Sequence, residues 1–174
     1  DFPVETPWFD HFLSTTCGND PAWIERLYQI IGYCLTADTK AKSIFVFQGI
    51  GNSGKSLLCN LLMRLYSRNS YLSIKPSKLS GQFALAAVYG KTLCVANDMS
   101  CKPLDPTAVS HLKELSGNDV ITSDVKYKNP ITFVNTSKII LTSNHAVLPS
   151  NKDDALMARF VALPFKFSVP KNQQ

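Results

Sequence analysis

The sequence lacks several features that would assign it to particular classes of protein. No apolar run approaches the ~18 residues needed to span a bilayer, and no charged-then-apolar leader argues for secretion. The cysteines number five, an odd count, and their spacing fits neither a C-x-x-C pair nor a zinc knuckle. There is no internal repeat and no low-complexity run. We therefore expect a cytoplasmic, intracellular protein with reduced thiols and no membrane partner.

Charged residues make up only 18% of the 174 residues, but their balance is basic, with a net charge of +5. The length suits one domain with a single sizeable core. A basic balance fits either a polyanionic partner or simply a basic surface, and charge alone leaves both open. Because the chain begins at Asp1 rather than Met, we expect it to be a fragment of a longer protein.

A glycine-rich loop follows a short apolar run and reads Gly49-x-x-x-x-Gly54-Lys55-Ser56. Glycines let backbone N–H groups curl around a phosphate, Lys55 adds a cation, and the Ser56 hydroxyl can ligate Mg²⁺. Leucines spaced at i, i+3, i+4 and i+7 predict a helix directly afterwards, with its positive end at the anion. The pattern therefore predicts binding of ATP and Mg²⁺. The predicted binding residues are Gly49, Gly51, Asn52, Ser53, Gly54, Lys55, Ser56 and Leu57.

The pattern of apolar segments predicts an α/β fold in which a mainly parallel sheet has helices on both faces. The predicted strands are 43–48, 71–74, 92–97, 138–143 and 160–165. A helix is expected from the Asp105-Pro106 cap to Gly117, and residues 121–133 read as an inserted β-hairpin. Helices over 2–17 and from Asn19-Asp20-Pro21 onward form a small helical segment, residues 1–40, before the core, residues 41–174.

Two predicted strands end in polar side chains suited to a hydrolytic ATP site. Such a site needs a carboxylate near Mg²⁺ and a polar group that orients the attacking water. Open α/β sheets bind ligands at the carboxyl ends of their strands. Asp98 follows one buried strand and is the expected acid and second metal ligand beside Ser56, although it could simply cap a turn. Asn144 follows another strand and is the expected water-orienting group, although turns favour Asn anyway.

Arg159 stands directly before the final strand. If it faces away from its own site, it can serve a neighbouring subunit's site as an arginine finger, a group that contributes about 10³–10⁵ in rate. It could equally be a surface arginine paired with Asp153 or Asp154, and the sequence leaves the two interpretations open.

The hairpin tip carries Lys126 and Lys128 on either side of Tyr127. In a strand-like tip both lysines point one way and the tyrosine points the other. Two cations and an aromatic ring suit phosphate contact with base stacking, the usual chemistry of single-strand binding. Lysine-rich tips are more often solvated turns, and this segment by itself favours the solvated turn.

Together these motifs resemble those of the superfamily III helicases, within them the phage, plasmid and large-DNA-virus primase–helicases. The Gly49–Ser56 loop resembles their Walker A motif, and the strand to Asp98 resembles their Walker B motif. The strand ending at Asn144 is similar to their sensor, and Arg159-Phe160 to their arginine finger. The segment from Leu112 to Thr122 is similar to the approach to their DNA-contacting hairpin.

The resemblance implies a P-loop NTPase fold of AAA+ type with a five-stranded sheet, and a hexameric ring in the full-length protein. It implies an ATP-dependent motor that translocates on single-stranded DNA and unwinds forked DNA during replication of a phage, plasmid or viral element. It raises Lys126, Tyr127 and Lys128 to expected DNA contacts and adds Lys113 as another. Lys55, Asp98, Asn144 and Arg159 would be the catalytic residues.

The chain departs from relatives that carry two adjacent acids where it has Asn97-Asp98, which should affect catalytic rate more than binding. Two other functions stay open at this point. One is a P-loop ATPase or nucleotide kinase without helicase activity, although no arginine-rich lid is evident. The other is a basic nucleic-acid-binding module with a degenerate nucleotide site.

Overall fold

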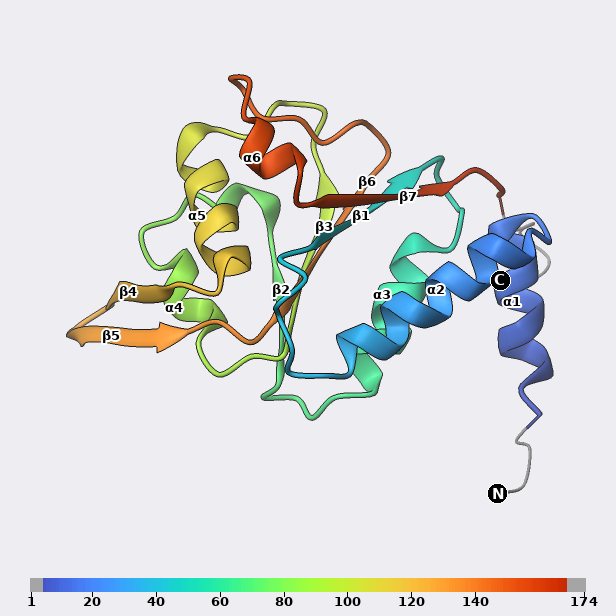
Figure 1. Cartoon of the computed structure of the whole chain (residues 1–174), viewed down its shortest axis with the longest axis horizontal. Helices are drawn as coiled ribbons and strands as arrows, with labels where there is room; N and C mark the ends of the chain where they lie inside the picture. Colours follow the sequence, from blue (N-terminus) through green and yellow to red (C-terminus); the bar gives the residue numbers. More distant parts are fainter. Residues whose placement is uncertain (1–4, 169–174) are drawn as a thin grey trace.

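The computed structural model describes residues 5–168 and is built on a five-stranded sheet in which every strand pairing is parallel (Figure 1). The strand order is β2-β3-β6-β1-β7. The strands are β1 (Ile44–Gly49), β2 (Tyr71–Ile74), β3 (Leu93–Met99), β6 (Lys138–Ser143) and β7 (Phe160–Phe165). All five predicted strands are therefore present, within two residues of the predicted bounds.

The sheet is covered on both faces because its central strands are apolar on both faces. In β1, Ile44 and Val46 pack into one core cluster, whereas Phe45 and Phe47 pack into the other. The helices that bury the second cluster are α1 (Pro7–Cys17), α2 (Pro21–Cys34) and α3 (Lys55–Arg64). The first cluster includes residues of α4 (Ala84–Val88), α5 (Pro106–Gly117) and α6 (Asp154–Met157), with the short 3₁₀ turn η1 (Pro76–Lys78) on the same side.

Two helices begin where the sequence predicts. The Asp20 side chain accepts a hydrogen bond from the Ala22 amide at 2.9 Å, and α2 starts at the following proline. The Asp105 side chain accepts from the Ala108 amide at 3.0 Å, and α5 likewise starts at a proline. Each cap satisfies an amide that the first helical turn cannot, which contributes about 1 kcal/mol. Residues 2–4 of the predicted first helix lie outside the described residues.

The N-terminal helices share their core with the sheet. Leu13 of α1 and Leu27 of α2 are buried in the same cluster as Phe45. Lys138, almost fully buried in β6, donates to the Thr36 carbonyl at 2.8 Å, with its ammonium 4.8 Å from the centre of the Tyr33 ring. Burial lowers the pKa of Lys138. These contacts fasten the end of α2 to the middle of the sheet.

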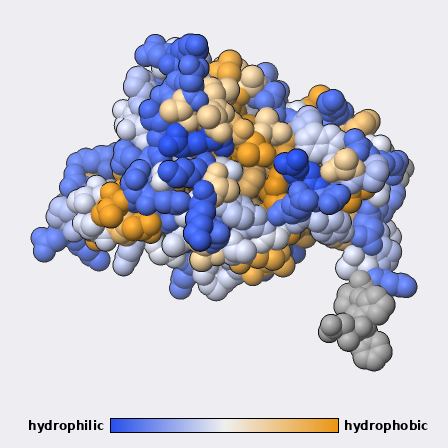
Figure 2. Space-filling view, in the orientation of Figure 1, coloured by the Kyte–Doolittle hydropathy of each residue, from blue (hydrophilic) through white to orange (hydrophobic). Residues whose placement is uncertain are grey.

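A separate two-stranded hairpin of β4 (Val120–Val125) and β5 (Lys128–Val134) lies between α5 and β6 in sequence, as predicted. It projects from the end of the molecule opposite α1 (Figure 1). Ile121 is buried and belongs to the core cluster shared by α4 and α5, so the base of the hairpin is anchored. Hydrophilic side chains gather around its tip (Figure 2).

Cys34, Cys59 and Cys94 are buried and unpaired, as the sequence predicted. No helix within residues 5–168 has the length and apolar character needed to cross a membrane. Three short elements, η1, α4 and α6, were not predicted, because three to five residues give no readable periodicity.

Candidate nucleotide-binding site

The glycine-rich loop joins β1 to α3 at the carboxyl edge of the sheet. Gly54, directly before α3, has φ +88, a left-handed conformation that residues with a Cβ rarely adopt. Asn52 also has positive φ, at 56. The loop therefore takes the tight turn that lets successive amides face a single anion, ending at the N-terminus of a helix.

Lys55 is folded back onto this loop. Its ammonium donates to the carbonyls of Gly49 at 2.9 Å and Ile50 at 2.6 Å, and to Ser53 Oγ at 3.1 Å. Burial lowers the pKa of Lys55, and the nearby Asp98 carboxylate partly opposes that shift. The cation is thus held at the mouth of the loop by acceptors weaker than phosphate oxygens.

Asp98 is presented by an irregularity in β3. The pairing of β3 with β6 shifts register between Ala96 and Met99, and Asp98 within this bulge has φ 56. The amide of Asp98 donates to Thr142 Oγ1 at 3.0 Å, and that hydroxyl donates to Asn97 Oδ1 at 3.3 Å. The Asn97 amide group is therefore engaged with the neighbouring strand, while the exposed Asp98 carboxylate lines the cavity.

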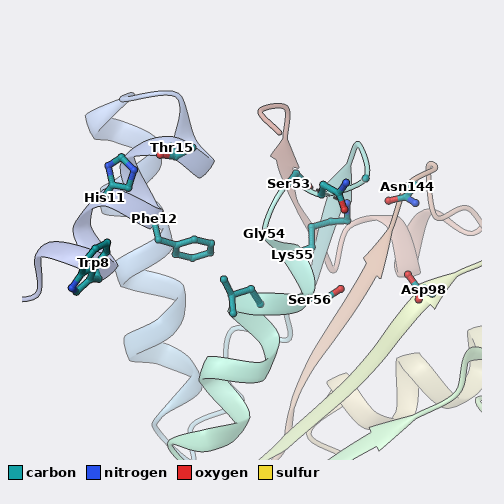
Figure 3. Close-up of a pocket in the computed structure, with 13 residues that line it drawn as sticks. Trp8, His11, Phe12, Thr15, Ser53, Gly54, Lys55, Ser56, Asp98 and Asn144 are labelled. Atoms are coloured by element: carbon teal, nitrogen blue, oxygen red, sulfur yellow. Dashed lines mark hydrogen bonds between the residues drawn. The ribbon is translucent and has the colours of Figure 1, made fainter. Parts of the chain in front are cut away.

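The strand order explains why these side chains meet. β6 lies between β1 and β3, so the loop, Asn144 and Asp98 stand at the carboxyl ends of three adjacent strands. A cavity of about 770 Å³ opens there, a size typical of small-molecule sites. Lys55, Ser56, Asp98 and Asn144 all line it (Figure 3). Of the predicted binding residues, 51–57 line the cavity, and Gly49 contributes the carbonyl bound by Lys55.

Arg159 is the one predicted catalytic residue that lies elsewhere. It directly precedes β7, and its carbonyl accepts from the Ile44 amide at 2.8 Å, at the amino edge of the sheet. The strand extends roughly 20 Å from Arg159 to Phe165, so Arg159 is far from the loop of its own chain. Its guanidinium donates through Nη1 to the Ala155 carbonyl at 2.6 Å.

Within the described residues, Arg159 forms no close ion pair with Asp153 or Asp154, although its charge contributes to the lowered pKa of Asp153. Asp153 accepts from Lys113 Nζ at 2.8 Å, and Asp154 lies 3.4 Å from Lys152 Nζ. Both carboxylates therefore have other partners. The bond to Lys113 lowers the pKa of Asp153 and engages the Lys113 ammonium with the start of α6.

The geometry predicted for the hairpin tip is also wrong. Lys126 and Tyr127 form the two-residue turn itself, and Tyr127 has φ 59. Strand alternation does not apply within a turn, so the Lys126 ammonium lies 4.9 Å from the centre of the Tyr127 ring instead of pointing away. All three tip residues are exposed, Tyr127 to 92%.

One wall of the cavity was missed by sequence reasoning. It comes from α1 and consists of Trp8, His11, Phe12 and Thr15. The signal that could have identified it is the i, i+3, i+4, i+7 spacing of these residues, which places them on one helical face. The apolar residues around them concealed that face, because aromatic residues at helical spacing usually belong to a core.

Substituting Gly54 should damage the loop. A Cβ on Gly54 would lie 2.7 Å from the Phe12 ring, in a backbone conformation unfavourable to side chains. We expect Gly54→Ala to lower stability by about 1–3 kcal/mol and to weaken nucleotide binding, measured by urea unfolding and calorimetry. Gly32→Ala is the control, because a Cβ there meets nothing within 4 Å. Equal stability of wild type and Gly54→Ala would contradict this account.

A glycine-rich loop follows the first strand of the parallel sheet, and polar side chains stand at the carboxyl ends of the next two strands on one side, β6 and β3. This arrangement defines a P-loop α/β domain. Residues 47–159 match a family described as a family of unknown function, DUF5906. This match covers more than half of the chain, and the protein belongs to that family.

The chain is 28% identical over 153 residues to a protein of Acanthamoeba polyphaga mimivirus named "Putative helicase L207/L206", covering 84% of this chain and 16% of that protein. Among solved structures, it is similar to the NrS-1 C-terminal region, with a TM-score of 0.72 and 20% identity over 94% of this chain and 39% of that one. It is also similar to JCV helicase, with a TM-score of 0.63 and 17% identity over 98% and 48% of the two chains.

The structural matches confirm the α/β fold predicted from the sequence. The similarity to a protein named as a putative helicase agrees with the predicted resemblance to helicases. The chain spans less than half the length of each of these proteins.

Proposed function

We propose that this chain is the ATPase motor domain of a DNA helicase, which hydrolyses ATP to translocate on single-stranded DNA and unwind duplex during replication of a phage, plasmid or viral element. The observation that carries the proposal is the convergence of Lys55, Ser56, Asp98 and Asn144 on one cavity. Similarity to a viral protein named as a helicase supports the choice of a DNA motor over other P-loop functions.

The residues of the cavity suit a magnesium-bound triphosphate. The Ser56 hydroxyl and the Asp98 carboxylate supply the hard oxygen ligands that Mg²⁺ prefers, and both line the cavity. Bound there, the ion would neutralise charge on the β- and γ-phosphates. Lys55 would exchange the loop carbonyls for phosphate oxygens, a stronger set of acceptors for an ammonium. Asp98 would polarise the attacking water, and the Asn144 amide would orient that water.

The position of Arg159 supports a site shared between subunits. About 20 Å of strand separates it from the loop of its own chain, so it can stabilise a transition state only in a neighbour's site. A closed ring, hexameric in the full-length protein, gives every site such a neighbour. Hydrolysis would then shift adjacent subunits against each other and move the hairpins that hold DNA.

The hairpin is the proposed DNA contact. Lys126 and Lys128 are exposed at its tip, and the exposed Tyr127 ring offers a stacking surface for a base. Lys113 could contact DNA only by leaving Asp153, so we place it outside the principal contacts.

Steady-state ATPase measurements with and without single-stranded DNA test the proposal. A motor should hydrolyse ATP faster when DNA is present. Turnover that DNA leaves unchanged would favour an ATPase or nucleotide kinase without helicase activity. Nucleotide and DNA binding without any turnover would favour the binding module with a degenerate site.

Replacing both tip lysines, Lys126→Ala with Lys128→Ala, should weaken DNA binding and reduce its salt dependence, because each lysine that contacts a phosphate releases about one counterion. Affinity for ATP should stay unchanged, since the tip does not line the cavity. Fluorescence anisotropy of labelled single strands at several salt concentrations gives both quantities. The control is Lys75→Ala with Lys78→Ala, which removes the same charge from exposed positions just before and at the end of η1. Unchanged DNA affinity in the tip variant would remove the hairpin from the mechanism.

A further inference from the structure

Two faces of helix α1 contact different parts of the molecule. One face contributes to the core beneath the sheet, through Phe9, Leu13 and Cys17. The other face lines the cavity, through Trp8, His11, Phe12 and Thr15. Phe12 also packs against that core, whereas Trp8, His11 and Thr15 are not part of it. Completing the core therefore does not explain these three cavity-lining side chains.

The cavity-lining face is docked against the phosphate loop. The Phe12 ring points from α1 toward the loop (Figure 3). Phe12 and the buried Thr16 are the side chains that a Cβ on Gly54 would meet, at 2.7 and 3.1 Å. The position of α1 and the conformation of the loop are therefore coupled by direct packing.

The cavity has two ends with different chemistry. Asp98 and Asn144 lie on one side of the loop, and the residues of α1 lie on the other (Figure 3). A triphosphate in the loop directs its terminal phosphate toward the carboxylate and its magnesium, as in other P-loop sites. The nucleoside at the other end of the same molecule must then extend toward α1.

The groups at the α1 end suit a flat aromatic ligand. Trp8 is 87% exposed, a rare exposure for a side chain of its size, and Leu57 across the cavity is 51% exposed. His11 adds ring nitrogens that can donate to and accept from the edge of a base. Base–aromatic stacking is the interaction that such a surface offers.

We infer that the cavity-lining face of α1 is the nucleoside subsite of the nucleotide site, with Trp8 stacking on a purine base and His11 reading its edge. A purine fits better than a pyrimidine because its two fused rings cover more of the aromatic surface. The inference rests on the proposed function, since it assumes that the loop holds the phosphates.

Calorimetry with Mg·ATP and with Mg·tripolyphosphate, which has phosphates but no nucleoside, tests the inference. Wild type should bind ATP more tightly than tripolyphosphate and more tightly than CTP. Trp8→Ala should weaken ATP binding about tenfold, as expected for one lost stack, and leave tripolyphosphate binding unchanged. Trp8→Phe should restore most of the ATP affinity, because phenylalanine can also stack.

The control is Asp10→Asn, on the opposite face of α1, where Asp10 accepts a hydrogen bond from the Tyr28 hydroxyl at 3.1 Å. The affinity of this variant for ATP should equal that of wild type.

Four outcomes would contradict the inference or the proposal beneath it. The purine subsite would be overturned if wild type bound ATP no more tightly than tripolyphosphate, or no more tightly than CTP. Equal losses for ATP and tripolyphosphate in Trp8→Ala would also overturn it, leaving α1 as a support for the loop. Unchanged ATP affinity in both Trp8→Ala and His11→Ala would do the same. Binding of neither ligand by folded wild type would instead overturn the proposed function itself.

Discussion

Lys55→Ala should abolish ATP turnover, with a loss of about 10²–10³-fold or more, because one preorganised charge beside the transferred phosphoryl group is removed. The side chain sits where the phosphates are expected, bound to the carbonyls of Gly49 and Ile50. Its absence leaves the negative charge that develops in the transition state without a nearby cation. Phosphate release at saturating Mg·ATP, in the presence of single-stranded DNA, measures the effect.

Two comparisons test whether the loss of turnover in Lys55→Ala comes from the missing ammonium, and not from a lower net charge or from unfolding. Lys40→Ala removes the same charge from an exposed position before β1, and its turnover should match wild type. Urea unfolding reports whether the loop survives without the three hydrogen bonds of the Lys55 ammonium. A folded Lys55→Ala protein that turns over ATP at the wild-type rate would rule out the site proposed here.

Arg159→Ala should lower turnover by about 10³–10⁵-fold while leaving affinity for Mg·ATP close to wild type. Turnover and affinity should respond differently because Arg159 is remote from the cavity of its own chain. It therefore makes no contact with nucleotide bound there. Arg159→Lys should recover little activity, because an ammonium lacks the planar fork that binds two phosphate oxygens. The measurement combines calorimetry with ATPase rates on assembled protein, with assembly followed by light scattering.

A mixing experiment tests whether the arginine acts across an interface. Subunits with Arg159→Ala keep an intact Asp98, and subunits with Asp98→Asn keep an intact Arg159, so a mixed interface can assemble one complete site. Activity should therefore reappear when the two inactive proteins are mixed. Lys152→Ala, at an exposed lysine near α6, is the control and should remain active. If mixtures assemble at every ratio and stay inactive, the shared site is wrong.

Much of the architecture could be predicted because it depends on local patterns. The helix caps at Asp20 and Asp105 can be recognised from the proline that follows each of them. The five strands appear as short apolar runs between turns. The glycine-rich loop is equally local, since eight consecutive residues carry both the turn and the chemistry. The helicase resemblance followed from the order of such motifs along the chain.

Local patterns failed where a side chain's surroundings come from distant segments. Asp98 was expected at a strand end, but the bulge that presents it depends on Thr142 in the adjacent strand. The pairing of Asp153 with Lys113 joins residues 40 positions apart, which no spacing rule could reveal. The predicted side-chain directions at the hairpin tip were wrong for a local reason. Lys126 and Tyr127 form a two-residue turn where strand geometry was expected.

By itself, the sequence determined which segments are strands and helices, and which loop can bind a phosphate, because short-range sterics and hydrogen bonding decide these. The tertiary structure alone decided the strand order that brings Asp98 and Asn144 to that loop and sends Arg159 to the opposite edge of the sheet. It also decided that α1 turns Trp8 toward the cavity. Packing between segments far apart in the chain sets these positions, and residue spacing does not encode them.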